Sequence, residues 1–317
     1  MSGTVEGASA SQLSETSQTT DRGERARSEP RRCLMCGGNE HGIAFTELGI
    51  DILRCKTCGH VFSSYRAEPH FAGYWGEQVA AGEHYYWSKA RARMHRDFFD
   101  RFIAGRSGRL LDMGSGLGFF LKAMQAFPDW EAYGCEISPA AVRHAREHLG
   151  LERVICSPPQ DADLPRNSFD IITLWDVLDH IPQPDPLLGR CHALLKDEGT
   201  IFIRTPNVAT QLFRARVMKA IRGIAPDRKY MQASDHAHFY SMRSIRTLLE
   251  RNGFRNVEFI HLHPIGGDSG RGWRSVVVTA LKTTSYYLLR ALATLSGGRL
   301  NFDNLFVVAR KSAATRS

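Results

Sequence analysis

The residues that could do chemistry begin with a glycine-rich stretch, GRLLDMGSGLGFFLKAM, at positions 108–124. An apolar run ending at Asp112 is typical of a buried strand, and three alternating glycines follow it: Gly114, Gly116 and Gly118. The residues from Phe119 onward are typical of a helix, so the glycines predict a strand-to-helix turn. A dinucleotide-binding turn needs its third glycine where this chain has Phe119. The spacing therefore disfavours a nicotinamide or flavin site.

Four of the seven cysteines form two close pairs with the spacing C-x2-C-x18-C-x2-C: Cys33, Cys36, Cys55 and Cys58. Thiolates at this spacing are typical of a tetrahedral zinc site. We expect the zinc to be structural, because four thiolates complete its coordination and leave no open position. The alternative is four free thiols in a short, strand-rich segment. The remaining cysteines lie in apolar patterns and are expected to be buried hydrophobic side chains: Cys135, Cys156 and Cys191.

Apolar strand patterns alternate with helical stretches from Arg109 onward, which is typical of a parallel sheet covered by helices. We therefore predict an α/β fold, with a doubly wound Rossmann-like sheet and a small N-terminal zinc ribbon. Ligands of such sheets bind beyond the carboxyl ends of the strands. The ends in chain order give the candidate site residues: Asp112 with the glycines, Glu136, Asp161 with Asp163, Trp175 with Asp176, and Thr205 to Asn207.

Five motifs occur in an order that resembles the class I S-adenosylmethionine-dependent methyltransferases. They are the acid–glycine turn, Glu136 at the end of the next strand, LPRNSFDIITLWDVLDHIPQP, LLKDEGTIFIRTPN and HAHFYSMRSIRTLLERNGF. The resemblance covers residues 108–260, resumes at NLFVVARK, and is nearest to the small-molecule group that includes ubiquinone-biosynthesis-type and sugar methyltransferases. A zinc-knuckle pair ahead of such a domain resembles members found in bacterial surface-polysaccharide pathways. Where the family has Glu before His after the fourth strand, this chain has Asp179 before His180.

The resemblance implies S-adenosylmethionine as the cofactor and gives two acids a role in binding it. Asp112 would anchor the ammonium group, directly or through water, and Glu136 would accept hydrogen bonds from the ribose hydroxyls. The glycines would let the backbone approach the cofactor closely. The alternative for Glu136 is a cap for the helix that begins near SPAAV.

The adenine edge of the cofactor has three candidate partners. Asp161 is the first, and Gln160 or Asp163 could take its place because CSPPQDADLP has extra residues compared with the family. Trp175 and Asp176, at the end of the fourth strand, complete the expected cofactor-binding set.

His180, in LDHIPQP, is the candidate catalytic residue. If the acceptor is a hydroxyl, a base must remove its proton, and an imidazole at the end of the fourth strand would face the sulfonium. The alternative is that His180 caps a helix or hydrogen-bonds a loop. His236 and His238 could line the acceptor pocket.

The expected function is methyl transfer to a small-molecule acceptor: a sugar, a nucleotide sugar or a lipid-linked glycan. The alternatives are an RNA methyltransferase that binds RNA through its zinc ribbon, and a scaffold without catalysis. The knuckles offer few aromatic residues for base stacking, and the chain lacks the Asn-Pro-Pro-aromatic element of base-amine methylators. We therefore do not expect a nucleic-acid partner.

Length and composition fit a globular protein with one large domain and a small module: 317 residues, 43% of them hydrophobic. We expect a disordered tail at 1–30, the zinc ribbon at 31–66, a linker and cap helix at 67–107, and the methyltransferase domain at 108–317. The tail holds ten Ser or Thr and almost no large apolar side chain. Without an apolar secretion signal, the expected location is cytoplasmic.

The formal charge of +8 is concentrated in two insertions of the large domain. Residues 211–232 hold six Lys or Arg against one Asp, and residues 266–300 hold five against one. Apolar residues recur at helical spacing in both: Phe213, Val217, Ala220, Ile221 and Ile224, then Val277, Leu281, Leu288, Leu292 and Leu295. Either these stripes pack on the domain beside solvated basic faces, or the helices rest on the inner face of an anionic membrane.

Overall fold

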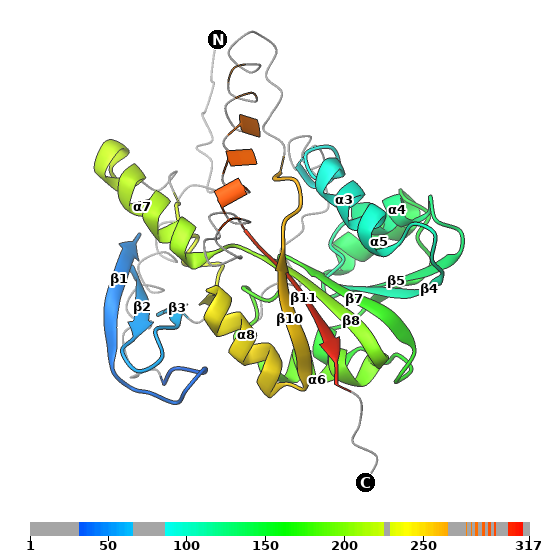
Figure 1. Cartoon of the computed structure of the whole chain (residues 1–317), viewed down its shortest axis with the longest axis horizontal. Coiled ribbons are helices and arrows are strands. Elements are labelled where there is room, and N and C mark those ends of the chain that lie inside the picture. The colour runs from blue at the N-terminus through cyan, green and yellow to red at the C-terminus, as the bar shows by residue number, and fades with distance from the viewer. Residues whose placement is uncertain are drawn as a thin grey trace, which may run out of the picture.

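The computed structural model describes residues 32–65, 86–224, 229–265 and 304–312, with nine single residues between 277 and 295. A seven-stranded sheet lies at its centre, in the order β10-β11-β8-β7-β4-β5-β6 (Figure 1). The strands are β4 (Gly108–Met113), β5 (Trp130–Glu136), β6 (Val154–Cys156), β7 (Phe169–Trp175), β8 (Leu195–Thr205), β10 (Phe254–Ile260) and β11 (Leu305–Lys311). The expected tail and most of the expected linker lie outside the described residues.

Six of these strands point in the same direction, and β11 runs opposite to them, pairing antiparallel with both β8 and β10. The predicted closing strand at NLFVVAR is therefore confirmed. Because β11 lies between β8 and β10, the sheet is antiparallel at this end and parallel elsewhere. The chain order reverses where β4 meets β7, because β4 has β5 on its other side. Open parallel sheets bind their ligands beside such a reversal, at the carboxyl ends of the strands.

Helices cover both faces of this sheet, so the predicted α/β layers are confirmed. One face carries α3 (Ala92–Phe102), α4 (Phe119–Met124) and α5 (Pro139–Glu147), and the other carries α6 (Pro184–Leu194) and α8 (Met242–Arg251). Alternation along β4 explains the two cores, since Leu110 packs with the first group of helices and Leu111 with the second.

Side-chain caps fix where several of these helices begin. The Ser138 hydroxyl accepts a hydrogen bond from the amide of Ala141, and Pro139 occupies the first turn of α5. Ser241 and Ser244 form a reciprocal capping box at α8. The 67–107 segment, expected to hold a linker and a helix, contains α3.

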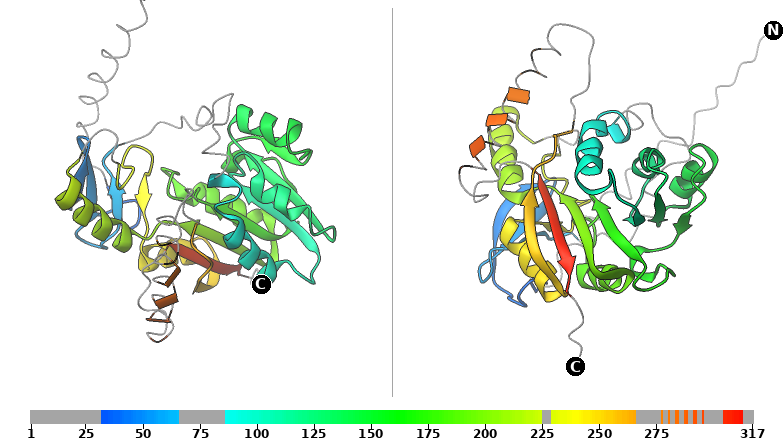
Figure 2. Two further views of the ribbon diagram at one scale, coloured as in Figure 1. Left: turned by 90° about the horizontal axis from the view of Figure 1, so that it is seen from above. Right: turned by 45° about the vertical axis from the view of Figure 1, so that its right-hand side comes forward.

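A second sheet adjoins the turns that carry the paired cysteines, and residues 33–63 are called the cysteine module below. Its strands are β1 (His41–Glu47), β2 (Ile50–Cys55) and β3 (Val61–Ser63), and its fourth strand is β9 (His238–Phe239), which comes from the larger part of the chain. Helix α7 (Val208–Arg222) packs on this sheet through Val208, Leu212 and Ala215. The segments 31–66 and 108–317, predicted as separate domains, therefore share a sheet and a hydrophobic core, and the two sheets lie side by side (Figure 2).

One expectation about side-chain burial is wrong: Cys156, expected to be a buried hydrophobic residue, is exposed because it ends the short edge strand β6. Of the two alternatives for the apolar stripe of the first insertion, packing on the domain holds for Ile224 but not for the residues within α7, since Phe213, Val217 and Ile221 are 71%, 40% and 70% exposed. A different stripe is buried, since Leu212 and Ala215 lie on the opposite side of the helix.

The third glycine of the turn gives a prediction about stability. Gly118 has a φ of 86°, and a Cβ there would lie 2.7 Å from Leu151 Cδ1 and 3.0 Å from Ala145 Cβ. We expect Gly118→Ala to lower the free energy of unfolding by about 2–4 kcal/mol, because it adds backbone strain and a clash with α5. Urea denaturation measures this.

Gly150→Ala is the matched control, because Gly150 also has a positive φ, 68°, but a Cβ added there would meet nothing within 4 Å. Equal losses in the two variants would show that the contact with Leu151 contributes nothing.

Candidate active site

A cavity of about 470 Å³ opens at the carboxyl ends of the central strands. Most of the candidate residues line it together: Asp112, Gly114, Gly116, Glu136, Trp175, Asp176 and His180. The other candidates lie outside its wall: Gly118, Asp161, Asp163 and Thr205 to Asn207. Gly118 faces Leu151 and α5, and in the short turn Pro159–Asp161 it is Pro159 and Gln160 that line the cavity.

Asp112 is a buried carboxyl at the end of β4. The hydroxyl of Thr173, on β7, donates a 2.7 Å hydrogen bond to its Oδ1. Burial raises the pKa of Asp112 to about 7, because removal from water disfavours the charged form, and the Thr173 hydrogen bond only partly offsets this. A cationic ligand would restore the ionised form, so this position suits an ammonium group.

Glu136 ends the neighbouring strand β5 and holds the glycine turn in place. Its Oε2 accepts a 2.7 Å hydrogen bond from the amide of Gly116, and its Oε1 accepts one of 2.9 Å from Ser138. Burial raises its pKa, and these backbone donors oppose the rise. Because Ser138 supplies the N-cap of α5, the alternative of Glu136 as that cap is not what the structure shows. A carboxylate has about four acceptor positions, so Glu136 keeps capacity for a ligand hydroxyl beside the amides of Gly116, Ile137 and Ser138.

Gly114, the first glycine of the turn, lies against Val177 on the loop that follows β7, and this contact leaves no room for a side chain. Gly114 has a φ of 77°, and a Cβ there would lie 2.5 Å from Val177 Cγ2. Gly116 also has a positive φ, 52°, and exposes its backbone to the cavity. At Gly114 and Gly116 the turn therefore presents backbone atoms, without side chains, to a ligand in the cavity.

Asp176 is bound by two arginines in a buried cluster. Arg91 Nη2 lies 2.6 Å from its Oδ2, and the guanidinium of Arg204 contacts its Oδ1. Arg91 also lies over the Trp87 ring, 4.0 Å from the centroid, and both of these side chains line the cavity. Sequence reasoning missed Arg91; its place one helical turn after Trp87 and just before α3 was the available signal.

His180 lies in the cavity wall, and one of its ring nitrogens forms a hydrogen bond with the backbone. Its Nδ1 is 2.9 Å from the backbone oxygen of Asp235. A carbonyl only accepts, so Nδ1 carries the proton and Nε2 of the neutral ring carries the lone pair. The helix that follows begins at Pro184 with Gln183 as its N-cap, so His180 does not cap it. It does hydrogen-bond a loop, and its Nε2 lies 3.9 Å from Asp179 Oδ2.

Behind His180 lie two buried polar residues. Asp179 is 1% exposed, and its Oδ2 is 3.3 Å from His236 Nε2. The His180 and His236 rings meet edge to face, with centroids 4.7 Å apart. Burial lowers the pKa of His236, which favours its neutral form. Neither His236 nor His238, expected to line the acceptor pocket, is in the cavity wall.

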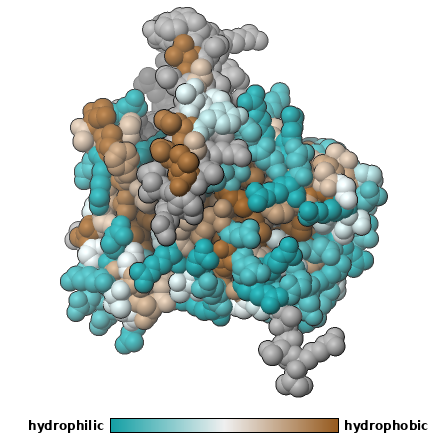
Figure 3. Space-filling model, in the orientation of Figure 1, coloured by the Kyte–Doolittle hydropathy of each residue, from teal (hydrophilic) through white to brown (hydrophobic). Residues whose placement is uncertain are grey.

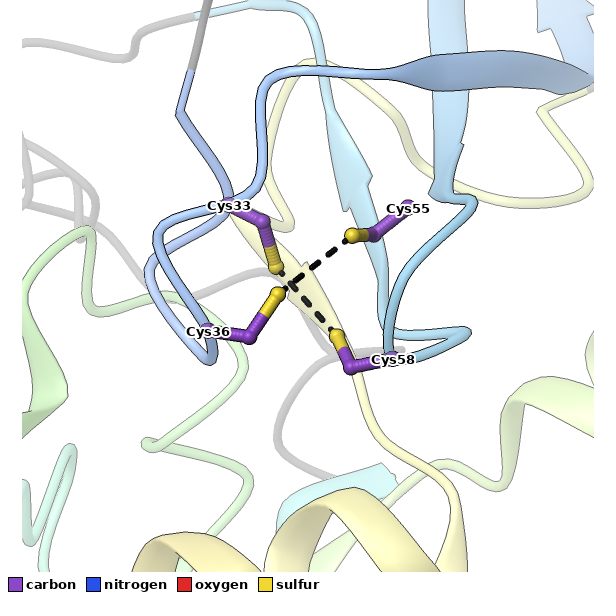
Figure 4. A group of neighbouring side chains, drawn as sticks. All are labelled: Cys33, Cys36, Cys55 and Cys58. Atoms are coloured by element: carbon purple, nitrogen blue, oxygen red, sulfur yellow. Dashed lines mark hydrogen bonds between the residues drawn. The ribbon is translucent and has the colours of Figure 1, made fainter.

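The four paired cysteines converge at the edge of the cysteine module (Figure 4). The Sγ atoms of Cys33 and Cys58 are 3.6 Å apart, and those of Cys36 and Cys55 are 3.5 Å apart. Four sulfurs at about 2.3 Å from a central zinc would be about 3.8 Å from one another. Backbone amides of each knuckle face a sulfur, including those of Met35 toward Cys33 and Thr57 toward Cys55. The geometry is compatible with a tetrahedral zinc site.

Comparison with known proteins identifies the large domain. A family model described as a methyltransferase domain matches residues 86–259. The chain belongs to this methyltransferase family. It is a class I S-adenosylmethionine-dependent methyltransferase, as the order of its motifs indicated, and the scaffold alternative is therefore wrong.

The curated relatives of this methyltransferase include ubiquinone biosynthesis O-methyltransferases. The one from Neisseria meningitidis is 28% identical over 117 residues, which cover 35% of this chain and 49% of the relative. The one from Coxiella burnetii is 25% identical over 176 residues, covering 53% and 73%. The chain thus spans about half the length of the first of these relatives.

A solved structure has the same fold. It is a complex between the Haloferax volcanii Trm112 methyltransferase activator and a putative methyltransferase, matched with a TM-score of 0.55 at 15% identity over 78% of this chain and 100% of that one.

The raised pKa of Asp112 predicts a pH-dependent affinity of this methyltransferase for its cofactor. An ammonium group binds the ionised carboxylate, so the affinity for S-adenosylmethionine should fall about tenfold per pH unit below about 7. Asp112→Asn should bind weakly at each pH and lose this dependence, whereas Asp170→Asn, at the opposite end of β7, should retain it. Calorimetric titration on both sides of pH 7 measures the effect.

The pH dependence of folding stability without ligand has the opposite sign to that of cofactor affinity. Between the ordinary carboxyl pKa and about 7, folded Asp112 binds more protons than the unfolded chain, so its contribution to stability declines as pH rises. A wild-type affinity that is constant across this range would contradict the assigned role of Asp112.

Proposed function

We propose that this methyltransferase transfers a methyl group to a hydroxyl of a sugar, a nucleotide sugar or a lipid-linked glycan, with His180 as the base. The observation that carries the proposal is that His180 lines the same cavity as Asp112 and Glu136. Its relatives from Neisseria meningitidis and Coxiella burnetii are O-methyltransferases by name, which supports a hydroxyl acceptor.

The cofactor is proposed to lie along the ends of β4 and β5. Asp112 would meet its ammonium group, and Glu136 its ribose hydroxyls. Arg91 would meet its carboxylate, because among the described lining residues it carries the guanidinium. Gln160, which lines the cavity, replaces Asp161 as the candidate for the adenine edge. Trp175 and Asp176 would close the site, with Asp176 holding Arg91 in place.

When bound, S-adenosylmethionine supplies an electrophilic methyl group whose leaving thioether needs no proton. The protein therefore has two tasks: aligning the acceptor and removing its proton. His180 is suited to the second, because Asp235 fixes the proton on Nδ1 and leaves the Nε2 lone pair. His180 Nε2 lies 3.9 Å from Asp179 Oδ2, and this carboxylate would stabilise the imidazolium formed by proton transfer.

A substitution of His180 tests this role. We expect His180→Gln to lower kcat about 100-fold or more, as loss of a general base does, while the cofactor Kd changes less than about twofold. His148→Gln, an exposed histidine at the end of α5, is the control and should match the wild type. The assay follows labelled methyl transfer to a panel of nucleotide sugars and lipid-linked glycans.

The same panel should include structured RNA, the acceptor of the alternative function. Methylation of RNA with none of the sugar acceptors used would overturn the proposed acceptor class. A His180→Gln variant with wild-type kcat would remove the assigned base.

We further propose that Cys33, Cys36, Cys55 and Cys58 bind one structural zinc. Three observations support this: the sulfurs lie at distances that a tetrahedral site needs, backbone amides point toward them, and all four ligands are cysteines. Zinc would supply folding energy to a module whose strands are short.

Metal analysis gives the corresponding prediction. We expect about one zinc per wild-type chain, and loss of most of it in Cys55→Ser because three thiolates hold the ion less tightly. Cys156→Ser is the control, since Cys156 is exposed and distant in sequence from the cluster. Full zinc in Cys55→Ser, or equal loss in the control, would contradict the site.

We also propose that α7 rests on an anionic membrane and brings the site near a lipid-linked acceptor. Its exposed apolar stripe, Phe213, Val217 and Ile221, is accompanied by four exposed basic side chains: Arg214, Arg216, Lys219 and Arg222. Figure 3 shows hydrophobic side chains gathered on the outer surface of α7. A basic amphipathic surface complements anionic lipid, and basic residues contribute about 1 kcal/mol each near such a surface.

The second insertion also exposes apolar side chains where it is described, and its basic residues lie outside the described residues. Val277, Leu288, Leu292 and Leu295 are exposed, while Leu281 lies outside the described residues. Among the described residues, no helix combines the length and hydropathy needed to cross a bilayer.

Vesicle sedimentation tests the membrane contact. We expect binding to phosphatidylcholine vesicles to increase with added phosphatidylglycerol and to weaken at high salt. The double variant Phe213→Ser with Ile221→Ser should lose most of this binding. The control Leu34→Ser with Leu48→Ser, which changes exposed apolar residues of the cysteine module, should not. No sedimentation at any composition would favour a water-soluble acceptor.

A further inference from the structure

We propose that the cysteine module positions the acceptor side of the active site, acting through residues 231–240. This inference rests on the role proposed for His180 and adds the residues that hold it. Residues 231–240, called the bridging segment here, contact the module along one edge and the loop that carries His180 along the other.

The module holds the bridging segment through β3. Val61 and Phe62 pair with Phe239 and His238 in antiparallel register. Beyond the strand, the amide of Ser63 donates to the oxygen of Ala237 at 3.0 Å, and its hydroxyl donates to the oxygen of Ala233 at 2.6 Å. The contacts extend over most of the segment, so its backbone follows the position of β3.

Glu47, at the end of β1, is a second attachment. It is 1% exposed, and its carboxylate accepts hydrogen bonds from the amides of Met231, at 3.0 Å, and Ala233, at 3.1 Å, as well as from Tyr230. Hydrogen bonds to a buried carboxylate are among the stronger ones in proteins. The module thus places a negative charge directly on the start of the bridging segment.

The other edge of the segment holds the catalytic loop. The backbone oxygen of Asp179 accepts hydrogen bonds from Ala237, at 2.8 Å, and His238, at 3.1 Å. The oxygen of Asp235 receives the Nδ1 proton of His180 at 2.9 Å. The tautomer of His180 therefore depends on where the bridging segment places one carbonyl group.

His60 and His238 form a second connection between the module and the 177–183 loop, and the donor and acceptor of each hydrogen bond can be assigned. His238 Nε2 lies 3.1 Å from the oxygen of Pro182, which lines the cavity, so Nε2 must donate. His238 Nδ1 then accepts from His60 Nε2, 3.0 Å away. His60 in turn receives the amide of Cys55 on its backbone oxygen. A continuous series of hydrogen bonds thus leads from the second cysteine knuckle to the cavity wall.

These contacts make Glu47, Ser63, His60 and His238 positioning residues, since they act on the reaction through His180 and the 177–183 loop. The cofactor acids, by contrast, lie on β4 and β5 and are fixed by the sheet. We therefore expect disturbance of the module interface to change the state of His180 and to leave cofactor binding intact. A series of contacts is only a candidate route, so coupling has to be measured.

The test compares two double variants of the full chain. The interface variant, Glu47→Gln with Ser63→Ala, weakens the attachment to the bridging segment. The control, Glu40→Gln with Ser64→Ala, makes the same chemical changes away from the bridging segment: Glu40 pairs with Lys56, and Ser64, just after the module, accepts the Asp51 amide.

The readouts need neither the acceptor nor the cofactor. In ¹⁵N-histidine-labelled protein, ring-nitrogen shifts report the tautomer of His180, assigned by its loss in His180→Gln. Amide exchange reports the hydrogen bonds of Ala237 and His238 to Asp179. A separate calorimetric titration with S-adenosylmethionine shows whether the main sheet is intact.

We expect His180 of the wild type to be protonated at Nδ1, and the interface variant to show a mixture of tautomers with amide exchange of Ala237 and His238 about tenfold faster. Cofactor Kd should stay within about twofold of the wild type, and the control should match it. Wild-type tautomer and exchange in the interface variant, or equal changes in the control, would overturn the proposal. A failure of methyl transfer with these results intact would instead remove the proposed function.

Discussion

Two buried carboxyl groups at the ends of neighbouring strands are the constraint on which the site depends. Asp112 on β4 and Glu136 on β5 lose most of their hydration, and burial raises the pKa of both. Such groups persist only where hydrogen bonds or a bound partner compensate them. Thr173 and the glycine turn supply part of this, and a ligand with an ammonium group and hydroxyls would supply the rest. The strand order, the positive φ angles of the turn and the reversal at β4 all serve to bring these two acids to one cavity.

The acceptor side is built differently, from loops fixed by residues distant in sequence. His180 takes its tautomer from Asp235, and the segment that contains Asp235 is held by Glu47 and Ser63 of the cysteine module. The main sheet holds Asp112 and Glu136, whereas the loop that carries His180 is held both by the main core, through Leu178, and by the segment that β9 joins to the module. The cofactor and acceptor ends of the cavity can therefore vary separately while the same methyl-transfer chemistry is retained.

Local spacing was enough to predict the fold, the glycine turn, the two acids and the convergence of four cysteines, because each depends on residues close in sequence or on strand ends that share an edge. The features that were missed depend on long-range contacts. Arg91 reaches Asp176 across 85 positions, and His60 reaches His238 across 178. Periodicity found an apolar stripe on α7 but could not show that Leu212 and Ala215, on another side, are the buried ones. Nor could composition decide between Gln160 and Asp161, since one backbone turn determines which side chain lines the cavity.

The most direct test of the account is calorimetric titration of S-adenosylmethionine into the wild type, Glu136→Ala and Glu131→Ala. Both glutamates lie on β5, but Glu131 is at the opposite end, where it pairs with Arg109 on the surface. We expect one cofactor site per wild-type chain, an unchanged Kd in Glu131→Ala, and at least about tenfold weaker binding in Glu136→Ala through loss of hydrogen bonds to a charged group. Equal affinity in all three proteins would contradict the placement of the cofactor at this edge of the sheet.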